Sequence, residues 1–155
     1  APFQFEGLAR RALLEAKFRG VTAHLPPLAT AAAGLVPADW QPEAVVPVPL
    51  APRRERRRGF NQATETARVV AEALGAPLEE RLVRRVRETP PQASLGLGGR
   101  ATNLRGAFAA TQRVPSRVLV VDDVTTTGAT FEAIAHALRV AGSTYVAALA
   151  LARED

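Results

Sequence analysis

The C-terminal third of the chain constrains the fold most, because one helix-like segment separates two strand-like apolar segments there. Residues 117–121 form a β-branched run typical of parallel strands that are buried on both faces. Residues 129–141 place apolar side chains at helical spacing, and Gly142 follows as a stop signal. Residues 145–151 are apolar again. Strand, helix and strand in this order predict a right-handed βαβ unit in a parallel sheet, and therefore an α/β fold.

The upstream segments add further helices and one strand. Helical spacing predicts helices within residues 5–18 and 23–33. Residues 44–50 predict a short buried strand that runs into a proline-bounded turn. Asn61 is placed to cap a helix that continues to about Leu74.

A long segment before the last strands has a different composition. Residues 84–106 contain two adjacent prolines and several Gly and Arg residues, which predicts a long mobile loop. Loops of this length are usually functional lids or disordered segments. We expect a single domain over residues 1–155, with a helical N-terminal part over residues 1–40 and a core over residues 44–155.

Composition excludes several classes of function. The chain of 155 residues has no Cys, which excludes disulfides, thiol catalysis and Cys-ligated metals within it. No apolar run is long enough to span a bilayer and no secretory signal is visible, so we expect a cytoplasmic protein. Because the sequence begins at Ala1 and lacks Met, we interpret it as a trimmed or partial product.

The positive charge of the chain comes almost entirely from arginine. The formal net charge is +5, and Lys17 is the only Lys. Arginine favours bidentate contact with phosphate. The alternative is a compositional bias toward Arg, and composition alone does not reveal a partner.

The joint between the predicted strand and helix is the strongest candidate for a ligand site. It reads Asp-Asp-Val-Thr-Thr-Thr-Gly-Ala-Thr over residues 122–130. Ligands of open α/β sheets bind beyond the carboxyl ends of the strands. The unpaired N–H groups and the dipole of the helix start favour a phosphate there. Gly128 lets the backbone approach the ligand, and the threonine hydroxyls add donors. The joint has no Lys, so it is not a Walker A loop. It also lacks the glycine pattern of a GxGxxG loop.

The adjacent carboxylates of Asp122 and Asp123 would repel a phosphate unless the ligand also carries hydroxyl groups and a divalent cation. Carboxylates accept hydrogen bonds from a diol and can hold Mg²⁺ through water. A phosphoribosyl group combines a 5-phosphate, a diol and Mg²⁺. The alternative is that the two acids merely cap the helix and the threonines form a turn.

Residues 118–130 resemble the phosphoribosyl pyrophosphate motif of type I phosphoribosyltransferases. The resemblance implies that fold, a mostly parallel twisted sheet flanked by helices with a small N-terminal helical hood. It implies that Asp122 and Asp123 are catalytic residues that contact the ribose hydroxyls. It also implies that both hold Mg²⁺ through water. The implied substrate-binding residues of this motif are Thr125, Thr126, Thr127, Gly128, Ala129 and Thr130, of which residues 126–130 hold the 5-phosphate.

Further segments are similar to the ComF family, a competence-associated branch that includes GntX-type proteins. These segments are residues 5–7, 16–20, 46–50, 58–62, 87–92 and 100–108. Members of that family usually carry an N-terminal Cys-rich zinc module. Either that module lies upstream of Ala1 or this protein lacks it, which leaves any zinc-dependent role in doubt.

Each segment has a structural alternative beside its functional interpretation. The strand end at Val48, Pro49 and Leu50 resembles a pyrophosphate loop, or is only a rigid turn. Residues 53–58 would neutralise pyrophosphate, bind a nucleic-acid backbone or form a solvated basic face.

Within residues 84–106, Arg87, Arg100 and Arg105 would close over pyrophosphate as part of a lid, unless the loop is disordered. Asn61 is interpreted as a helix cap and Lys17 as a helix-surface residue.

Two hypotheses for the function follow from the resemblance. The first is a transferase of the glycosyltransferase (pentosyltransferase) class that transfers a phosphoribosyl group to a nitrogenous acceptor. The second is a non-catalytic module of the DNA-uptake machinery that senses phosphoribosyl pyrophosphate or binds single-stranded DNA, although aromatic residues make up only 5% of the chain. The expected partners are phosphoribosyl pyrophosphate, Mg²⁺, single-stranded DNA and other competence proteins, with a homodimer as an open alternative.

Overall fold

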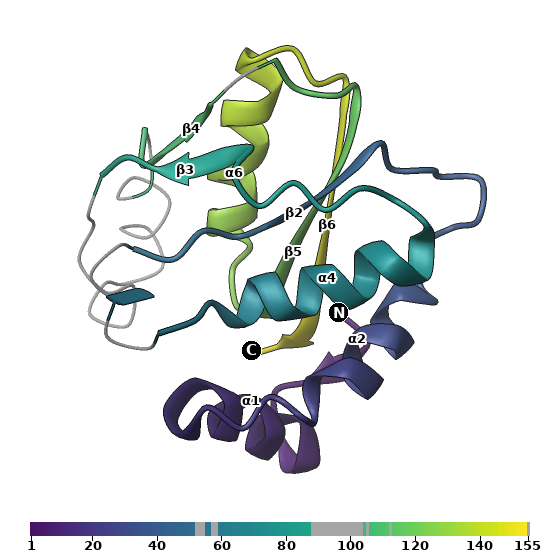
Figure 1. The fold of residues 1–155 in the computed structure, drawn as a ribbon, viewed down its shortest axis with the longest axis vertical. Coiled ribbons are helices and arrows are strands. Elements are labelled where there is room, and N and C mark those ends of the chain that lie inside the picture. Colours follow the sequence, from purple (N-terminus) through teal and green to yellow (C-terminus); the bar gives the residue numbers. More distant parts are fainter. Residues whose placement is uncertain (52–54, 57–58, 88–103, 105, 112, 155) are drawn as a thin grey trace.

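The computed structural model describes residues 1–51, 55–56, 59–87, 104, 106–111 and 113–154. In this part of the chain, a parallel sheet forms the centre of the molecule (Figure 1). Its strands, in spatial order, are β1 (Phe3–Gln4), β6 (Tyr145–Arg153), β5 (Arg117–Thr125) and β2 (Ala44–Pro47). A separate antiparallel pair consists of β3 (Val83–Arg85) and β4 (Phe108–Ala110). The α/β fold with a mostly parallel sheet is therefore confirmed.

Helices cover both faces of the parallel sheet. Figure 1 shows α6 on one face and α4 with α2 on the other, and α1 lies beyond the carboxyl ends of β5 and β6. The bounds of these helices are α1 (Gly7–Arg19), α2 (Leu25–Ala33), α4 (Gln62–Leu74) and α6 (Ala129–Val140). The segment β5-α6-β6 is the predicted βαβ unit, with β5 and β6 paired in parallel. Every described helix is too short or too polar to cross a membrane.

Side chains of β5 alternate between the two layers of the core. Leu119 and Val121 belong to the cluster that also contains residues of α2 and α4. Val118 and Val120 belong to the cluster that contains Ile134 and other residues of α6. A strand buried on both faces needs apolar residues at every position, which is why residues 118–121 contain no polar residue. The core thus fixes the carboxyl end of β5 against the start of α6.

The predicted elements are confirmed, with differences at their ends. β5 continues to Thr125 because β6 continues beside it, and Thr125 pairs with Arg153. The prediction that Asp122 and Asp123 lie in the loop was therefore wrong, since both belong to the end of the strand.

The segment that begins at residue 84 was predicted as a loop, but Arg84 and Arg85 pair with β4. Most of that segment, residues 88–103 and 105, lies outside the described residues. The long loop therefore stays a prediction for these residues.

Asn61 joins two parts of the fold at the start of α4. Its side-chain Oδ1 accepts a hydrogen bond from Ala63 N at 3.1 Å, which confirms the predicted cap. Its Nδ2 donates to the carbonyl oxygen of Val48 at 3.0 Å, beyond the end of β2. The residue therefore holds the turn after β2 against the helix.

We expect Asn61→Ala to lower the free energy of unfolding by about 1–2 kcal/mol, because it removes the cap and leaves the Val48 carbonyl without this donor. Asn61→Ser keeps a cap acceptor without adding a charge, so its loss should be smaller. Urea denaturation of both variants checks this order, and equal stability of Asn61→Ala and the unmodified protein would contradict it.

Candidate functional site

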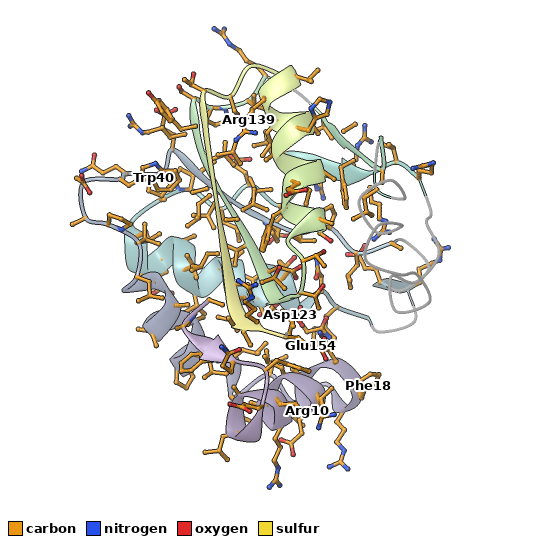
Figure 2. The ribbon with its side chains drawn as sticks, turned by 180° about the vertical axis from the view of Figure 1, so that it is seen from behind. Arg10, Phe18, Trp40, Asp123, Arg139 and Glu154 are labelled. Carbon is orange, nitrogen blue, oxygen red and sulfur yellow. The ribbon has the colours of Figure 1, made fainter. Side chains whose placement is uncertain are left out.

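A cavity of about 540 Å³ opens at the carboxyl ends of β5 and β6, a size common for small-molecule sites. The end of β5, the following loop, and the start of α6 form one wall. The turn after β2, the start of α4 and one face of α1 contribute most of the other lining residues. Figure 2 shows Asp123 and Glu154 at this end of the sheet, with α1 beyond them. The cavity therefore lies where open α/β sheets bind ligands.

The start of α6 forms a cradle of backbone amides. The N-cap Gly128 has φ 79°, a left-handed conformation that other residues rarely adopt. Thr127 Oγ1 accepts a long hydrogen bond of 3.4 Å from Ala129 N. The amides of the first turn have no acceptor within a helix and carry the positive end of its dipole. This geometry suits an anion such as a phosphate.

Gly128 is required for its backbone conformation. A Cβ at this position would meet no atom within 4 Å. The close approach of this backbone to a ligand stays a prediction, because the space beside Gly128 is open. The positive φ angle is the property that a side chain would oppose.

The two acids at the end of β5 are held by the backbone. Asp122 Oδ1 accepts a hydrogen bond from Asp123 N at 2.8 Å, and Asp123 Oδ1 accepts one from Val124 N at 2.9 Å. Asp123 Oδ2 lies 3.0 Å from Lys17 Nζ. Apart from this ion pair, the buried Oδ2 atom has no hydrogen-bond partner among the described residues. A carboxylate oxygen has two lone pairs, so a buried Oδ2 with one charged neighbour can still accept a hydrogen bond from a ligand.

The electrostatics of the pair follow from its burial. Desolvation raises the pKa of the partly buried Asp122 carboxyl well above its usual range, and the neighbouring charge of Asp123 raises this pKa further. The positive charge of Lys17 acts on the same pKa in the opposite direction. Asp122 therefore holds its proton more readily than an ordinary carboxyl, and a cation beside the pair favours the ionised form of both acids.

Lys17 is the main functional candidate that the sequence interpretation missed. It was predicted to be a helix-surface residue, but its side chain is only 21% exposed and lines the cavity. Its Nζ atom also lies 5.9 Å from the centre of the Phe5 ring. Nearby, the Gln62 side chain donates to the carbonyl oxygen of Ala16 at 3.4 Å and ties α1 to α4. The only sequence signal for a role of Lys17 was that it is the single Lys of the chain.

The cavity collects most of the candidate residues on one surface. Its lining includes Val48, Pro49, Leu50, Asp122, Asp123, Thr125, Thr126, Thr127, Gly128, Ala129 and Thr130. At the start of the turn after β2, Val48 N donates to the carbonyl oxygen of Val121 at 2.9 Å, so this amide is already bonded within the protein.

The arginines predicted to contact pyrophosphate are not found in the described cavity lining. Arg87 is exposed and does not line the cavity, whereas Arg85, which the sequence did not single out, does. Arg100, Arg105 and the basic residues at 53, 54, 57 and 58 lie outside the described residues. Glu154 also lines the cavity, and its backbone N donates to the carbonyl oxygen of Thr125 at 2.9 Å. The sequence interpretation missed Glu154 because the last strand was predicted to span only residues 145–151.

The two carboxylates at the end of β5 are the candidate ligands for Mg²⁺. Within the described residues, no three His, Asp or Glu side chains gather in a way that could hold a metal ion. The ammonium group of Lys17 lies 3.0 Å from Asp123 Oδ2, where it would repel a dication. The donor set therefore does not fit a divalent ion bound directly at Asp123.

Similar sequences come from proteins of bacterial competence and DNA utilization. Competence protein F of Haemophilus influenzae is 39% identical over 116 residues, which cover 72% of this chain and 51% of that protein. DNA utilization protein YhgH of Salmonella typhimurium is 38% identical over 113 residues, covering 72% of this chain and 50% of that protein. This chain is a homologue of competence protein F. The resemblance to the ComF family is thereby confirmed, and the chain spans about half the length of these relatives. No protein-family model matches the sequence.

Solved structures support the fold of this ComF homologue. Purine phosphoribosyltransferase from Pyrococcus horikoshii has a TM-score of 0.50 at 16% identity, over 80% of this chain and 69% of that one. Glutamine phosphoribosylpyrophosphate amidotransferase from B. subtilis has a TM-score of 0.52 at 23% identity, over 80% of this chain and 25% of that one. At these identities the likeness concerns the fold alone, and the type I phosphoribosyltransferase fold is confirmed.

Proposed function

We propose that this ComF homologue binds phosphoribosyl pyrophosphate in the cavity and transfers its phosphoribosyl group to a nitrogenous acceptor, in a process tied to competence and DNA utilization. The observation that carries the proposal is Asp123 Oδ2, a buried acceptor beside a helix start whose one polar neighbour among the described residues is the ammonium group of Lys17. A ribose hydroxyl supplies a hydrogen-bond donor. A 5-phosphate supplies the anion that the helix start favours.

The roles of the residues follow from their places. The loop residues 125–130 hold the 5-phosphate through backbone amides and threonine hydroxyls. Asp122 and Asp123 hold the diol, and their negative charge stabilises the positive charge that develops on the ribose ring when pyrophosphate leaves C1. A nitrogen of the acceptor then forms the new bond to C1. Catalysis consists mostly of positioning and charge stabilisation.

Pyrophosphate needs positive charge, and the described lining offers Arg85 and Lys17. The expected Mg²⁺ would neutralise charge on the leaving pyrophosphate. Because the carboxylates do not fit a directly bound divalent ion, we propose that this ion enters with the pyrophosphate of the ligand. Arg87 lies outside the lining, and its closure over bound pyrophosphate remains part of the proposal.

A second candidate function is supported by the exposed side of α1 next to the cavity. Arg10 and Arg19 are exposed on this helix, and Phe18, which also borders the cavity, is 72% exposed. Cations beside an exposed aromatic ring are typical of surfaces that bind single-stranded nucleic acid. A non-catalytic module that senses phosphoribosyl pyrophosphate or binds DNA would retain the cavity without turnover.

The release of pyrophosphate from phosphoribosyl pyrophosphate, measured across a panel of nitrogenous bases, tests the transferase. Turnover with any base supports it. Binding of phosphoribosyl pyrophosphate without turnover, together with DNA binding that weakens steeply with salt, supports the second candidate. A protein that neither binds nor turns over phosphoribosyl pyrophosphate contradicts the proposed use of the cavity.

A further inference from the structure

We propose that Lys17, from α1, is the built-in cation of the acidic pair at the end of β5, and that its ammonium group takes the place of a divalent ion there. The inference concerns the cavity of the proposed function and rests on that function for the identity of the ligand. It adds a positioning residue that holds Asp123 ready for the ligand.

The position of the ammonium group is the first support. Lys17 Nζ lies 3.0 Å from Asp123 Oδ2, and the two side chains are 21% and 10% exposed. An ion pair at this depth is screened much less than one at the surface. The Phe5 ring, whose centre lies 5.9 Å from Nζ, provides an apolar neighbour on another element. The lysine is therefore partly enclosed, unlike Arg11 on the same helix, whose side chain is 76% exposed.

The charge of the site is the second support. Two adjacent carboxylates carry a charge of about −2 when both are ionised, and this charge opposes an anionic ligand. One ammonium group halves that charge. Asp123 Oδ2 has two lone pairs, and Lys17 is its one polar neighbour among the described residues, so this oxygen can still accept a bond from a ligand hydroxyl. Lys17 thus neutralises Asp123 and leaves acceptor capacity for the ligand.

The attachment of α1 is the third support. Gln62 at the start of α4 donates to the carbonyl oxygen of Ala16, the residue before Lys17. Leu13 and Ala16 are fully buried in the core cluster beneath the helix. Both anchors fix the helix close to Lys17, so the ammonium group is positioned by the fold.

The binding of Mn²⁺ alone, followed by isothermal calorimetry, tests the inference without any phosphorylated ligand. Lys17→Gln removes the cation and should bind Mn²⁺ at least about tenfold more tightly than the unmodified protein, because the carboxylates lose their counter-charge. Lys17→Arg keeps the charge and should bind Mn²⁺ as weakly as the unmodified protein. Arg139→Gln removes the same charge at the far end of α6 and should change nothing (Figure 2).

Equal Mn²⁺ affinity of Lys17→Gln and the unmodified protein would overturn the inference. Thermal unfolding of each variant separates a loss of folding from a change of the site. Lys17→Met, which removes the charge but keeps the length of the side chain, replaces Lys17→Gln if that variant unfolds.

The affinity for phosphoribosyl pyrophosphate in EDTA and in Mg²⁺ tests the link to the ligand. Removal of Mg²⁺ should weaken binding to Lys17→Gln at least about tenfold more than binding to the unmodified protein. An equal loss for both proteins would contradict the role of Lys17. If the unmodified protein does not bind phosphoribosyl pyrophosphate in either condition, the proposed function fails, and the Mn²⁺ result still decides the role of Lys17.

Discussion

Asp123→Asn is expected to weaken the binding of phosphoribosyl pyrophosphate by about tenfold to a hundredfold. The substitution keeps the shape of the side chain but replaces a charged acceptor by a neutral one. Hydrogen bonds to charged groups contribute about 1.5–3 kcal/mol, against about 0.5–1.5 kcal/mol for neutral ones, and each 1.4 kcal/mol corresponds to about a factor of ten in affinity. Calorimetric titration of both proteins measures the difference.

The fold should tolerate this change. The loss of the ion pair with Lys17 is offset in part by relief of the repulsion between Asp122 and Asp123. Asp39→Asn removes the same charge at an exposed position outside the cavity lining and provides the control. Unchanged affinity in Asp123→Asn, with the fold intact, would remove Asp123 from the ligand site.

Gly128→Val is expected to abolish measurable binding or to weaken it by more than about tenfold, and to destabilise the fold by about 1–3 kcal/mol. A β-branched residue does not adopt φ 79° without strain, so the loop before α6 must change its conformation. The amides that form the cradle then move away from the position that the phosphate requires. Titration and thermal unfolding measure the two effects separately.

Gly75→Val is the matched control for this prediction. Gly75 ends α4 with φ 63°, and a Cβ there would also meet no atom within 4 Å. The residue is not part of the cavity lining. We expect a comparable loss of stability without a loss of affinity. A similar fall in affinity for both variants would show that the effect at Gly128 is general destabilisation.

Local sequence patterns were enough to predict the strand, loop and helix that form one wall of the site. The apolar run in β5 and the helical spacing in α6 depend on neighbours along the chain, so the βαβ unit and its phosphate cradle could be derived from the sequence. The length of β5 could not be derived in this way. Asp122 and Asp123 are in the strand because β6 pairs beside them, and polar residues do not signal such pairing.

Contacts between distant segments account for the other differences. Lys17 reaches Asp123 because β1 and α4 hold α1 over the carboxyl ends of the strands, a relation that no spacing within α1 encodes. The short strands β1, β3 and β4 contain too few residues for an alternating pattern. The sequence showed that Gly128 precedes the helix, but only the φ angle shows that its backbone conformation requires a glycine.

A crystal structure of the protein with phosphoribosyl pyrophosphate tests the central claim most directly. The account predicts the 5-phosphate against the amides of residues 126–130 and a ribose hydroxyl donating to Asp123 Oδ2. A ligand bound elsewhere, or bound in the cavity without a hydrogen bond to Asp123 Oδ2, would contradict it.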